Sequence, residues 1–232
     1  MTKIRGSRDS MRFKWLSSME LRKTFEILSE NGGKVFCVGG CVRDSMLDRV
    51  VTDIDLATDV KPREVKRLFQ RPGFKVLSSA MKYGTITVIS GKQIFQITTF
   101  RSDLETDGRH AKVCFSQSLK EDAQRRDFTI NALYMNLNGE IIDPLSGLKD
   151  LRRGYVRFIG DPTTRIREDY LRILRYFRFL SVYEEDNENL DQSALLACAK
   201  NKRYLRSLSK ERVWMEFKNI LSSAKPLRAI KA

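Results

Sequence analysis

Residues 34–58 read KVFCVGGCVRDSMLDRVVTDIDLAT, in which two short apolar runs enclose a glycine pair and a polar segment. The run at 34–38 predicts a strand, and the segment CVRDSML at 41–47, which follows the glycines, predicts a helix. The alternation of polar and apolar residues in TDIDL at 52–56 predicts a second strand. This stretch therefore predicts a strand–helix–strand unit, and the first candidate functional residues lie within it.

The second of these strands carries two carboxylates, Asp53 and Asp55. Residues i and i+2 of a strand point to the same face, so the two side chains converge. Close carboxylates repel each other unless a cation neutralises them, and hard oxygen ligands suit Mg²⁺ held jointly with substrate phosphates. Taken alone, a pair with this spacing is more typical of a solvated strand surface.

Gly39 and Gly40 open the segment GGCVRD, directly after the first strand. Glycines let the backbone approach a phosphate, helix N-terminal amides face it, and Arg43 adds a positive charge. An ordinary tight strand-to-helix turn is the alternative interpretation. Because Asp53 follows shortly after in the sequence, we favour a phosphate cradle and a metal site within one unit.

The rest of the chain indicates an α+β architecture, a small mixed sheet followed by a helical region. Helical spacing and capping residues predict helices at 16–30, 59–70 and 118–128. Strand signals occupy 74–79, 84–90 and 92–100. Only helical patterns occur from about Asp161 onward, at 166–183, 190–200 and 209–222. We therefore expect one domain over 1–157 and a second over 158–232.

Two connections are predicted from their turn residues and polarity. ALYMNLNGEIIDP at 132–144 predicts a hairpin with a type I′ turn at Asn138-Gly139. The segment 101–112, RSDLETDGRHAK, is polar and aperiodic and contains Gly108, so it predicts a mobile loop.

The charge balance favours a polyanionic partner. The chain has 232 residues with 43 Lys and Arg against 29 Asp and Glu, and its net charge is +14. Residues 1–150 contribute +6 and the last 82 contribute +8, so the density of positive charge rises toward the C-terminus. Nucleic acid or nucleotides are the leading candidates for such a partner.

Composition also excludes several classes of protein. No apolar run approaches the roughly 20 residues that span a bilayer, so we expect no membrane association. The four cysteines have no CxxC spacing, and the single histidine cannot complete a zinc site with them. The sequence predicts neither a disulfide framework nor structural zinc, and we expect a cytoplasmic protein.

A series of longer motifs then makes a resemblance specific. GGCVRD, DIDLATD, GTITV, QITTFRSD, TDGRHA, RRDFTINALY, DPLSGLKDL, RFIGDP and RIREDYLRILRYFRF occur in this order. The chain resembles the class II CCA-adding tRNA nucleotidyltransferases, within a polymerase-β-like superfamily that includes bacterial poly(A) polymerases. The resemblance covers about Val35 to Tyr183, and the segment SLSKERVWMEFKNIL shows a weaker similarity.

The resemblance implies a polymerase-β-like nucleotidyltransferase head followed by an all-helical neck. It also implies addition of CCA to the 3′ end of tRNA from CTP and ATP, with tRNA as the macromolecular partner. Asp53 and Asp55 match the pair that holds the catalytic metal ions, expected to be Mg²⁺. Gly39, Gly40 and Arg43 would hold the triphosphate.

RRDFTINA resembles the motif that recognises the ribose. It implies a nucleotide contact for Arg126 and sugar or supporting roles for Asp127 and Asn131. Arg125 is assigned a supporting role, and without the motif Arg125 and Arg126 are typical of a solvated basic pair.

The segment from Glu168 to Arg178 carries the expected base selection. On one continuous helix, Asp169, Arg172 and Arg175 fall at i, i+3 and i+6 and form a polar ridge. Salt bridging along the helix is the alternative interpretation. The resemblance instead makes Asp169 and Arg172 an amino-acid template for the Watson–Crick edge of C and A. Glu168 would orient Arg172, and Arg175 and Arg178 would contact phosphates.

The loop 101–112 resembles the element that helps the template switch from CTP to ATP in these enzymes. Arg101, Asp107 and Arg109 of this loop are assigned supporting roles.

Two features depart from the family. Gln96 stands on the strand where relatives often carry a third carboxylate, and the chain ends at Ala232 where relatives continue into further helices. We therefore expect the body and tail domains to be absent, with either a monomer or a dimer. The alternatives kept open are an enzyme that adds only CC or only A, a poly(A) polymerase, and a non-catalytic RNA-binding remnant.

Overall fold

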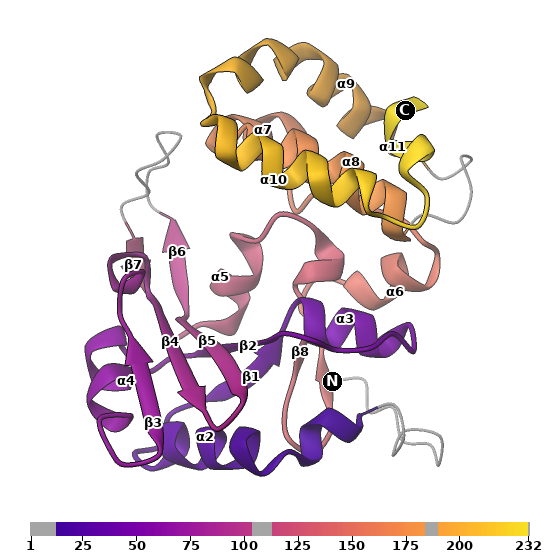
Figure 1. Cartoon of the computed structure of the whole chain (residues 1–232). Helices are drawn as coiled ribbons and strands as arrows, with labels where there is room; N and C mark the ends of the chain where they lie inside the picture. Colours follow the sequence, from indigo (N-terminus) through magenta and orange to yellow (C-terminus); the bar gives the residue numbers. More distant parts are fainter. Residues whose placement is uncertain (1–12, 104–112, 184–189, 232) are drawn as a thin grey trace. The chain divides into compact units, whose positions relative to one another are not determined.

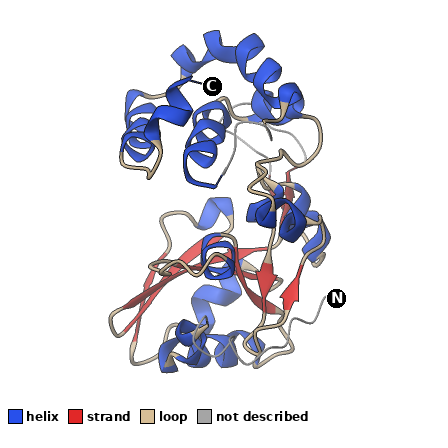
Figure 2. Cartoon of the chain, turned by 90° about the vertical axis from the view of Figure 1, so that its right-hand side faces the viewer, coloured by secondary structure: helices blue, strands red, loops and turns tan. Residues whose placement is uncertain are grey.

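The computed structural model describes residues 13–103, 113–183 and 190–231, and the chain forms two compact units. Unit 1 contains residues 13–103, 113–125 and 131–144, whereas unit 2 contains 126–130 and the described residues from 145 onward. Within the described residues every named strand belongs to unit 1, and unit 2 is helical (Figures 1 and 2). The expected α+β architecture, a mixed sheet followed by helices, is confirmed.

A seven-stranded sheet forms the centre of unit 1. In spatial order its strands are β3 (Phe74–Leu77), β4 (Thr85–Ser90), β5 (Gln93–Thr99), β2 (Ile54–Thr58), β1 (Val35–Val38), β8 (Tyr134–Met135) and β9 (Ile141–Ile142). The pair β2–β5 is parallel, and the other neighbours are antiparallel. The pair β6 (Arg101–Asp103) and β7 (Val113–Phe115) forms a separate small sheet.

Helix α3 (Gly40–Met46) contacts the large sheet through β1 and β2. Helices α2 (Met19–Ser29) and α4 (Pro62–Leu68) contact the sheet through β1, β4 and β5. Along β4, half-exposed residues alternate with buried ones, as expected for a sheet with one covered face. In β2 only Asp55 is half-buried, and the four other residues of the strand are buried.

Shorter elements complete unit 1. They are η1 (Lys14–Ser17), α3 (Gly40–Met46), η2 (Met81–Tyr83), α5 (Leu119–Gln124) and η3 (Thr129–Asn131), the last of which crosses into unit 2. The indole Nε1 of Trp15 in η1 donates to the Ser45 hydroxyl at 2.7 Å, which ties η1 to α3. Ser18 caps α2 by accepting from the Leu21 amide, so α2 begins at Met19 and Leu16 belongs to the preceding turn.

Unit 2 is a group of short helices. They are α6 (Gly147–Arg152), α7 (Pro162–Glu168), α8 (Leu171–Tyr183), α9 (Gln192–Asn201), η5 (Lys202–Ser207), α10 (Lys210–Leu221) and α11 (Pro226–Lys231). Helix α8 packs against α10 and α11, while α7 packs against α9. Phe128, Phe158 and Phe179 form an aromatic core, with ring centroids of Phe128 and Phe158 separated by 4.8 Å.

The expected single helix over 166–183 is wrong. Helix α7 ends at Glu168, Asp169 is extended with φ −155° and ψ 107°, and α8 begins at Leu171. The Asp169 carboxylate accepts from the Leu171 amide at 3.1 Å, so this side chain competes with a continuous helix by capping a new one. The hydrophobic spacing is helical on both sides of the break and therefore did not reveal it.

Two predicted connections also differ. Residues 101–103 are not loop but strand β6, which pairs with β7, and residues 104–112 lie outside the described residues. In the hairpin between β8 and β9, Gly139 has φ +75°, whereas Asn138 is not among the described non-glycine residues with positive φ. A type I′ turn needs a positive φ at both Asn138 and Gly139. Instead, the Asn136 side chain accepts from the amides of Asn138 and Glu140, which closes a longer turn.

Candidate functional site

The parallel pairing of β2 with β5 in unit 1 places Asp55 beside Gln96. Asp55 lies in β2 and pairs in register with Gln96 of parallel strand β5, which in turn pairs with Thr87 of β4. Asp53 directly precedes β2, is exposed, and accepts from the Thr52 hydroxyl at 3.2 Å. The strand therefore begins two residues later than expected, and Gln96 occupies the position next to Asp55 that the sequence suggested for a third carboxylate.

The donor set here fits a divalent cation that also binds substrate. No group of three or more His, Cys, Asp or Glu side chains suited to a metal occurs among the described residues. Magnesium in nucleotide-binding sites is often held by one or two carboxylates, with water and phosphate oxygens completing the shell. Asp53 and Asp55 supply such carboxylates, and the Gln96 amide oxygen is a neutral donor next to them. That these two aspartates hold the metal ion stays a prediction.

The glycine turn of unit 1 is built around a buried arginine. Gly39 has φ +72° and ψ −120°, a conformation that glycine adopts readily, and α3 begins at Gly40. Arg43 is only 8% exposed and donates to both carboxylate oxygens of Asp44 at 3.0 and 3.1 Å. Its Nη1 also donates to Asn131 Oδ1. The structure thus brings together Gly39, Gly40, Arg43 and Asn131, all predicted site residues.

The RRDFTINA segment divides between the two units after Arg125. Arg125 forms an ion pair with Asp122 at 2.6 Å, and this fully buried carboxylate also accepts from the Tyr134 hydroxyl at 2.7 Å. A buried carboxylate needs such partners. Arg125 therefore stabilises unit 1 and is not the solvated side chain that the sequence alone favoured.

In unit 2 the same segment contributes Arg126 and Asp127. Asp127 is buried, accepts from the Phe128 amide at 2.8 Å, and forms an ion pair with Arg175 at 2.5 Å. This carboxylate raises the pKa of the Arg175 guanidinium above its ordinary value, while burial opposes the shift. The backbone carbonyl of Arg126 accepts from Arg165 at 2.6 Å.

Asp169 lies in the break between α7 and α8, Arg172 lies in the first turn of α8, and each is held by several contacts. Besides capping α8, Asp169 accepts from Arg212 of α10 at 2.7 Å. Arg172 Nη1 donates to the Arg165 carbonyl at 2.7 Å and to the Glu168 carboxylate. A carboxylate and a guanidinium are thus fixed within one helical turn, with Arg172 attached to Glu168 as the sequence suggested.

The two remaining predicted arginines also have carboxylate partners. Glu216 of α10 is buried and lies 3.5 Å from Arg175 and 2.8 Å from Arg178. Phosphate contacts by Arg175 and Arg178 stay a prediction, because the observed partners lie within unit 2 itself.

Sequence reasoning missed Arg165, Arg212 and Glu216. Burial lowers the pKa of the Arg165 guanidinium, which forms an ion pair with Glu168 at 2.6 Å. Arg212 and Glu216 are spaced i and i+4 in the motif ERVWMEF, so one face of α10 reaches both Asp169 and the α8 arginines. The i, i+4 spacing was the signal that could have identified Arg212 and Glu216 as a functional pair. It did not reveal their partners, which are about 40 residues away in the sequence.

The loop residues are only partly described. Arg101 is half-buried and donates to the Tyr83 carbonyl. Asp107 and Arg109 lie outside the described residues, so their supporting roles stay predictions. In the part of the chain that the structure describes, no helix has the length and apolar character needed to cross a membrane.

Comparisons with known proteins identify the families that this chain resembles. A family described as "Poly A polymerase head domain" matches residues 35–157, and one described as "Probable RNA and SrmB- binding site of polymerase A" matches 189–232. The CCA tRNA nucleotidyltransferase 1, mitochondrial, of Danio rerio is 41% identical over 84% of this chain and 46% of its own length. The CCA-adding enzyme of Bacillus licheniformis is 39% identical over 88% of this chain and 50% of its own.

Among solved structures, the Bacillus stearothermophilus CCA-adding enzyme in complex with CTP matches with a TM-score of 0.80 and 34% identity. The match covers 90% of this chain and 50% of that one. This chain therefore spans about half the length of the curated relatives it matches.

Proposed function

This chain belongs to the family of the poly(A) polymerase head domain, and from that premise we propose that it is a tRNA nucleotidyltransferase. It adds CCA, or part of CCA, to the 3′ end of tRNA from CTP and ATP. The residues 1–157 form the nucleotidyltransferase head, and 158–232 form the helical neck that selects the base and binds RNA. The similarity to named CCA-adding enzymes supports this assignment over a general poly(A) polymerase.

The observation that carries the proposal is the fixed pair of Asp169 and Arg172. A carboxylate accepts from the exocyclic amine of C or A, and a guanidinium donates to a ring nitrogen or carbonyl of the same edge. U and G present a different pattern of donors and acceptors to the same pair. Contacts from Arg212 to Asp169, and from Glu168 to Arg172, hold both groups in place before the nucleotide binds.

The chemistry is the attack of the RNA 3′-hydroxyl on the NTP α-phosphate. The new bond joins the 3′-oxygen to the α-phosphorus, the bond to the β-phosphate breaks, and pyrophosphate leaves. Asp53 and Asp55 would hold Mg²⁺, which when bound stabilises negative charge on the triphosphate and assists loss of the hydroxyl proton. The Gly39 amide donates to the Leu133 carbonyl at 3.0 Å, so Gly39 would act by shaping the turn. The Gly40 amide at the start of α3 would face the triphosphate, and Arg43 would supply a positive charge near it.

The buried network supports these roles. Asn131 positions Arg43, and Asp127 positions Arg175 and the start of the aromatic core. Arg126 is proposed to contact the nucleotide, and Arg175 and Arg178 to contact phosphate. We propose a reducing cytoplasmic setting, which suits a chain whose four cysteines are free.

The test is incorporation of single labelled nucleotides into three tRNA transcripts, ending before C, after C and after CC. Full CCA addition predicts CTP incorporation into the first two and ATP incorporation into the third. Incorporation restricted to CTP or to the single ATP step identifies partial addition, and long ATP ladders on every transcript identify a poly(A) polymerase. Absence of any incorporation, with RNA binding retained, would overturn the enzymatic assignment.

A further inference from the structure

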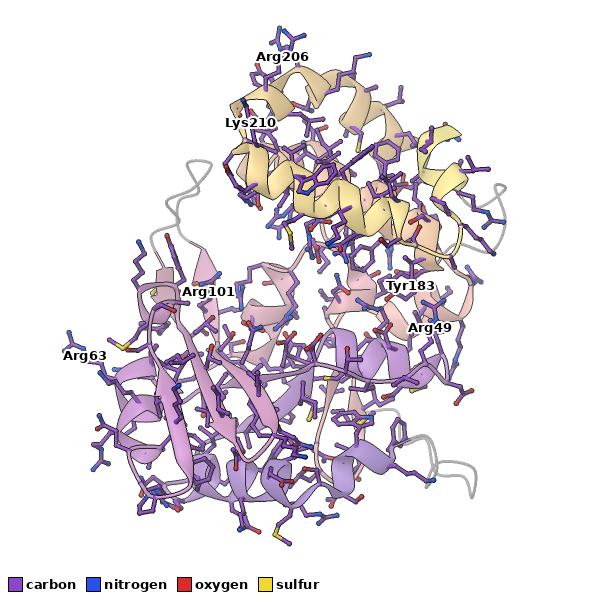
Figure 3. The ribbon with its side chains drawn as sticks, viewed as in Figure 1. Arg49, Arg63, Arg101, Tyr183, Arg206 and Lys210 are labelled. Carbon is purple, nitrogen blue, oxygen red and sulfur yellow. The ribbon has the colours of Figure 1, made fainter. Side chains whose placement is uncertain are left out.

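A concentrated positive surface lies on unit 2 between α9 and α10. Residues 192–210 contain no carboxylate. Five cationic side chains of this stretch are exposed, namely Lys200, Lys202, Arg203, Arg206 and Lys210. Figure 3 shows Arg206 and Lys210 near one another at the same end of the helical unit, projecting from the ribbon. Such a surface attracts a phosphate backbone.

The backbone of this surface is ordered by specific contacts. Asn201 at the end of α9 is buried, and its side-chain amide donates to the Ala197 carbonyl at 2.8 Å. The following η5 is a 3₁₀ helix, in which residues at i and i+3 lie on the same side. Arg203 and Arg206 therefore share one side of η5. The positive groups are presented by a fixed scaffold instead of a loose chain.

An exposed aromatic ring lies among these cations. Tyr204 is 37% exposed, and its ring stacks on Tyr170 with centroids 4.7 Å apart and an interplanar angle of 15°. The Arg203 guanidinium lies over the Tyr204 ring, 4.8 Å from its centroid, and donates to the hydroxyl at 2.8 Å. Tyr170 directly follows Asp169, so the stack connects the positive surface to the proposed base-selecting residue.

We propose that the Tyr204 platform binds the unpaired 3′ end of the RNA substrate. The platform comprises Tyr170, Arg203, Tyr204 and Arg206, together with Lys200, Lys202 and Lys210. The inference rests on the proposed function and specifies which residues bind the unpaired 3′ end of the RNA. Unpaired bases expose the faces that stack on aromatic rings and guanidinium planes, whereas bases within a double helix do not. The exposed cations of the platform attract the accompanying phosphates.

The first experiment measures RNA binding by the full chain with fluorescence anisotropy, without nucleotide or metal. The probes are a labelled RNA hairpin with a short unpaired 3′ overhang and the same hairpin with a blunt end. The parent chain binds the overhang hairpin more tightly. Tyr204→Ala weakens overhang binding by about tenfold and leaves blunt-end binding within about twofold. Tyr204→Phe keeps the stack and retains the preference, which controls for folding.

The charge contribution is tested with the double variant Arg203→Gln/Arg206→Gln. It weakens binding of both hairpins and lowers the slope of log affinity against log salt by about 2. The matched control is Arg22→Gln/Arg63→Gln, which removes two exposed arginines from α2 and α4 of unit 1. Figure 3 shows Arg63 projecting from α4. The control lowers the slope by less than half as much.

Three outcomes overturn the platform. They are a parent chain without preference for the overhang, a Tyr204→Ala variant that keeps the preference, and a Tyr204→Ala variant that loses affinity for both hairpins equally. Nucleotide addition separates this inference from the proposed function. A chain that prefers the overhang but adds no nucleotide contradicts only the function, whereas addition with an unchanged KM for RNA in Tyr204→Ala contradicts only the platform.

Discussion

The two clusters of predicted site residues use charged side chains in opposite ways, although unit 1 also contains ion pairs such as Arg125–Asp122. In unit 1, like charges gather, with Asp53 and Asp55 two residues apart and the neutral Gln96 beside the second. In unit 2, opposite charges alternate, so that Asp169 meets Arg212 and Glu168 meets Arg172. The first arrangement needs a cation from outside the chain to offset repulsion. In the second arrangement the charges are neutralised within the chain, and the ion pairs fix the orientation of the Asp169 and Arg172 side chains. One region is therefore suited to chemistry at a phosphate and the other to discrimination between bases.

The largest expected effect tests the carboxylates of unit 1. Asp53→Ala or Asp55→Ala lowers the rate of nucleotide incorporation by at least about a thousandfold, because the metal ligands act in the chemical step. Affinity for tRNA changes little. Single-turnover incorporation and a binding titration measure the two quantities, and Glu26→Ala, an exposed carboxylate of the same unit, is the control. Incorporation within tenfold of the parent would refute the metal assignment.

The next effect tests discrimination in unit 2. Asp169→Ala or Arg172→Ala lowers the preference for CTP and ATP over UTP and GTP by about tenfold to a hundredfold, a loss of about 1–3 kcal/mol per group. The ratio of kcat/KM values for the four nucleotides measures this preference. Because Asp169 also caps α8, Asp169→Asn serves as a variant that can keep the cap. If all three variants select nucleotides as the parent does, the template assignment fails.

A smaller effect is expected for Arg212, a positioning residue that contacts Asp169 from α10. Arg212→Met lowers nucleotide preference by about threefold to fivefold, since the ion pair is partly exposed and worth only about 1 kcal/mol. Arg212→Lys retains part of the nucleotide preference. The same kcat/KM ratios report the result. Loss of thermal stability with unchanged preference would make Arg212 merely structural.

Gln96→Glu makes the surroundings of Asp55 more acidic. A third carboxylate next to Asp55 strengthens cation binding, so the Mg²⁺ concentration for half-maximal rate falls by about twofold while the maximal rate is retained. A magnesium titration of the incorporation rate measures this change. Severe loss of activity would instead indicate that the neutral amide has a positive role.

The smallest effect concerns Asp161, which caps α7 by accepting from the Thr164 amide and hydroxyl at 2.7 and 2.8 Å. These hydrogen bonds lower the pKa of Asp161 below its ordinary value. Its stabilising contribution is therefore present above the ordinary pKa and is lost as pH falls through the lower, folded value. Asp161→Ala unfolds at a lower temperature than the parent at neutral pH, and the difference shrinks in acid. A difference that grows as the pH falls would contradict the assignment.

The sequence predicted the parts of the fold that rest on local patterns. The strand–helix–strand unit around Gly39, the strands at 74–100 and the helices after Pro62 and Ser118 are all present. Side chains that compete with the backbone account for the main errors. Asp169 caps α8 and interrupts a helical pattern, and Asn136 closes a hairpin turn in place of positive φ at Asn138.

For the candidate site, the motifs identified residues but not their partners. Asp169 and Arg172 were named from one segment, whereas the contact from Arg212 depends on how α10 packs on α8. Likewise, the sequence alone favoured a solvated basic pair for Arg125 and Arg126. Residue spacing did not reveal that Asp122 is buried and binds both Arg125 and Tyr134. Long-range pairing is set by tertiary packing, and a single sequence carries little information about it.

The indole of Trp15 in unit 1, which donates to Ser45, has one counterpart in the sequence, Trp214 on α10 of unit 2. The first is half-buried and hydrogen-bonded, whereas the second is 59% exposed. Each unit thus carries its own natural fluorophore in a different environment. Each single Trp→Phe replacement would leave one tryptophan in the chain, either in unit 1 or in unit 2, and Trp214 would emit at longer wavelength and be more open to quenching by iodide. The melting of the two units can then be followed separately by light alone, without any added label.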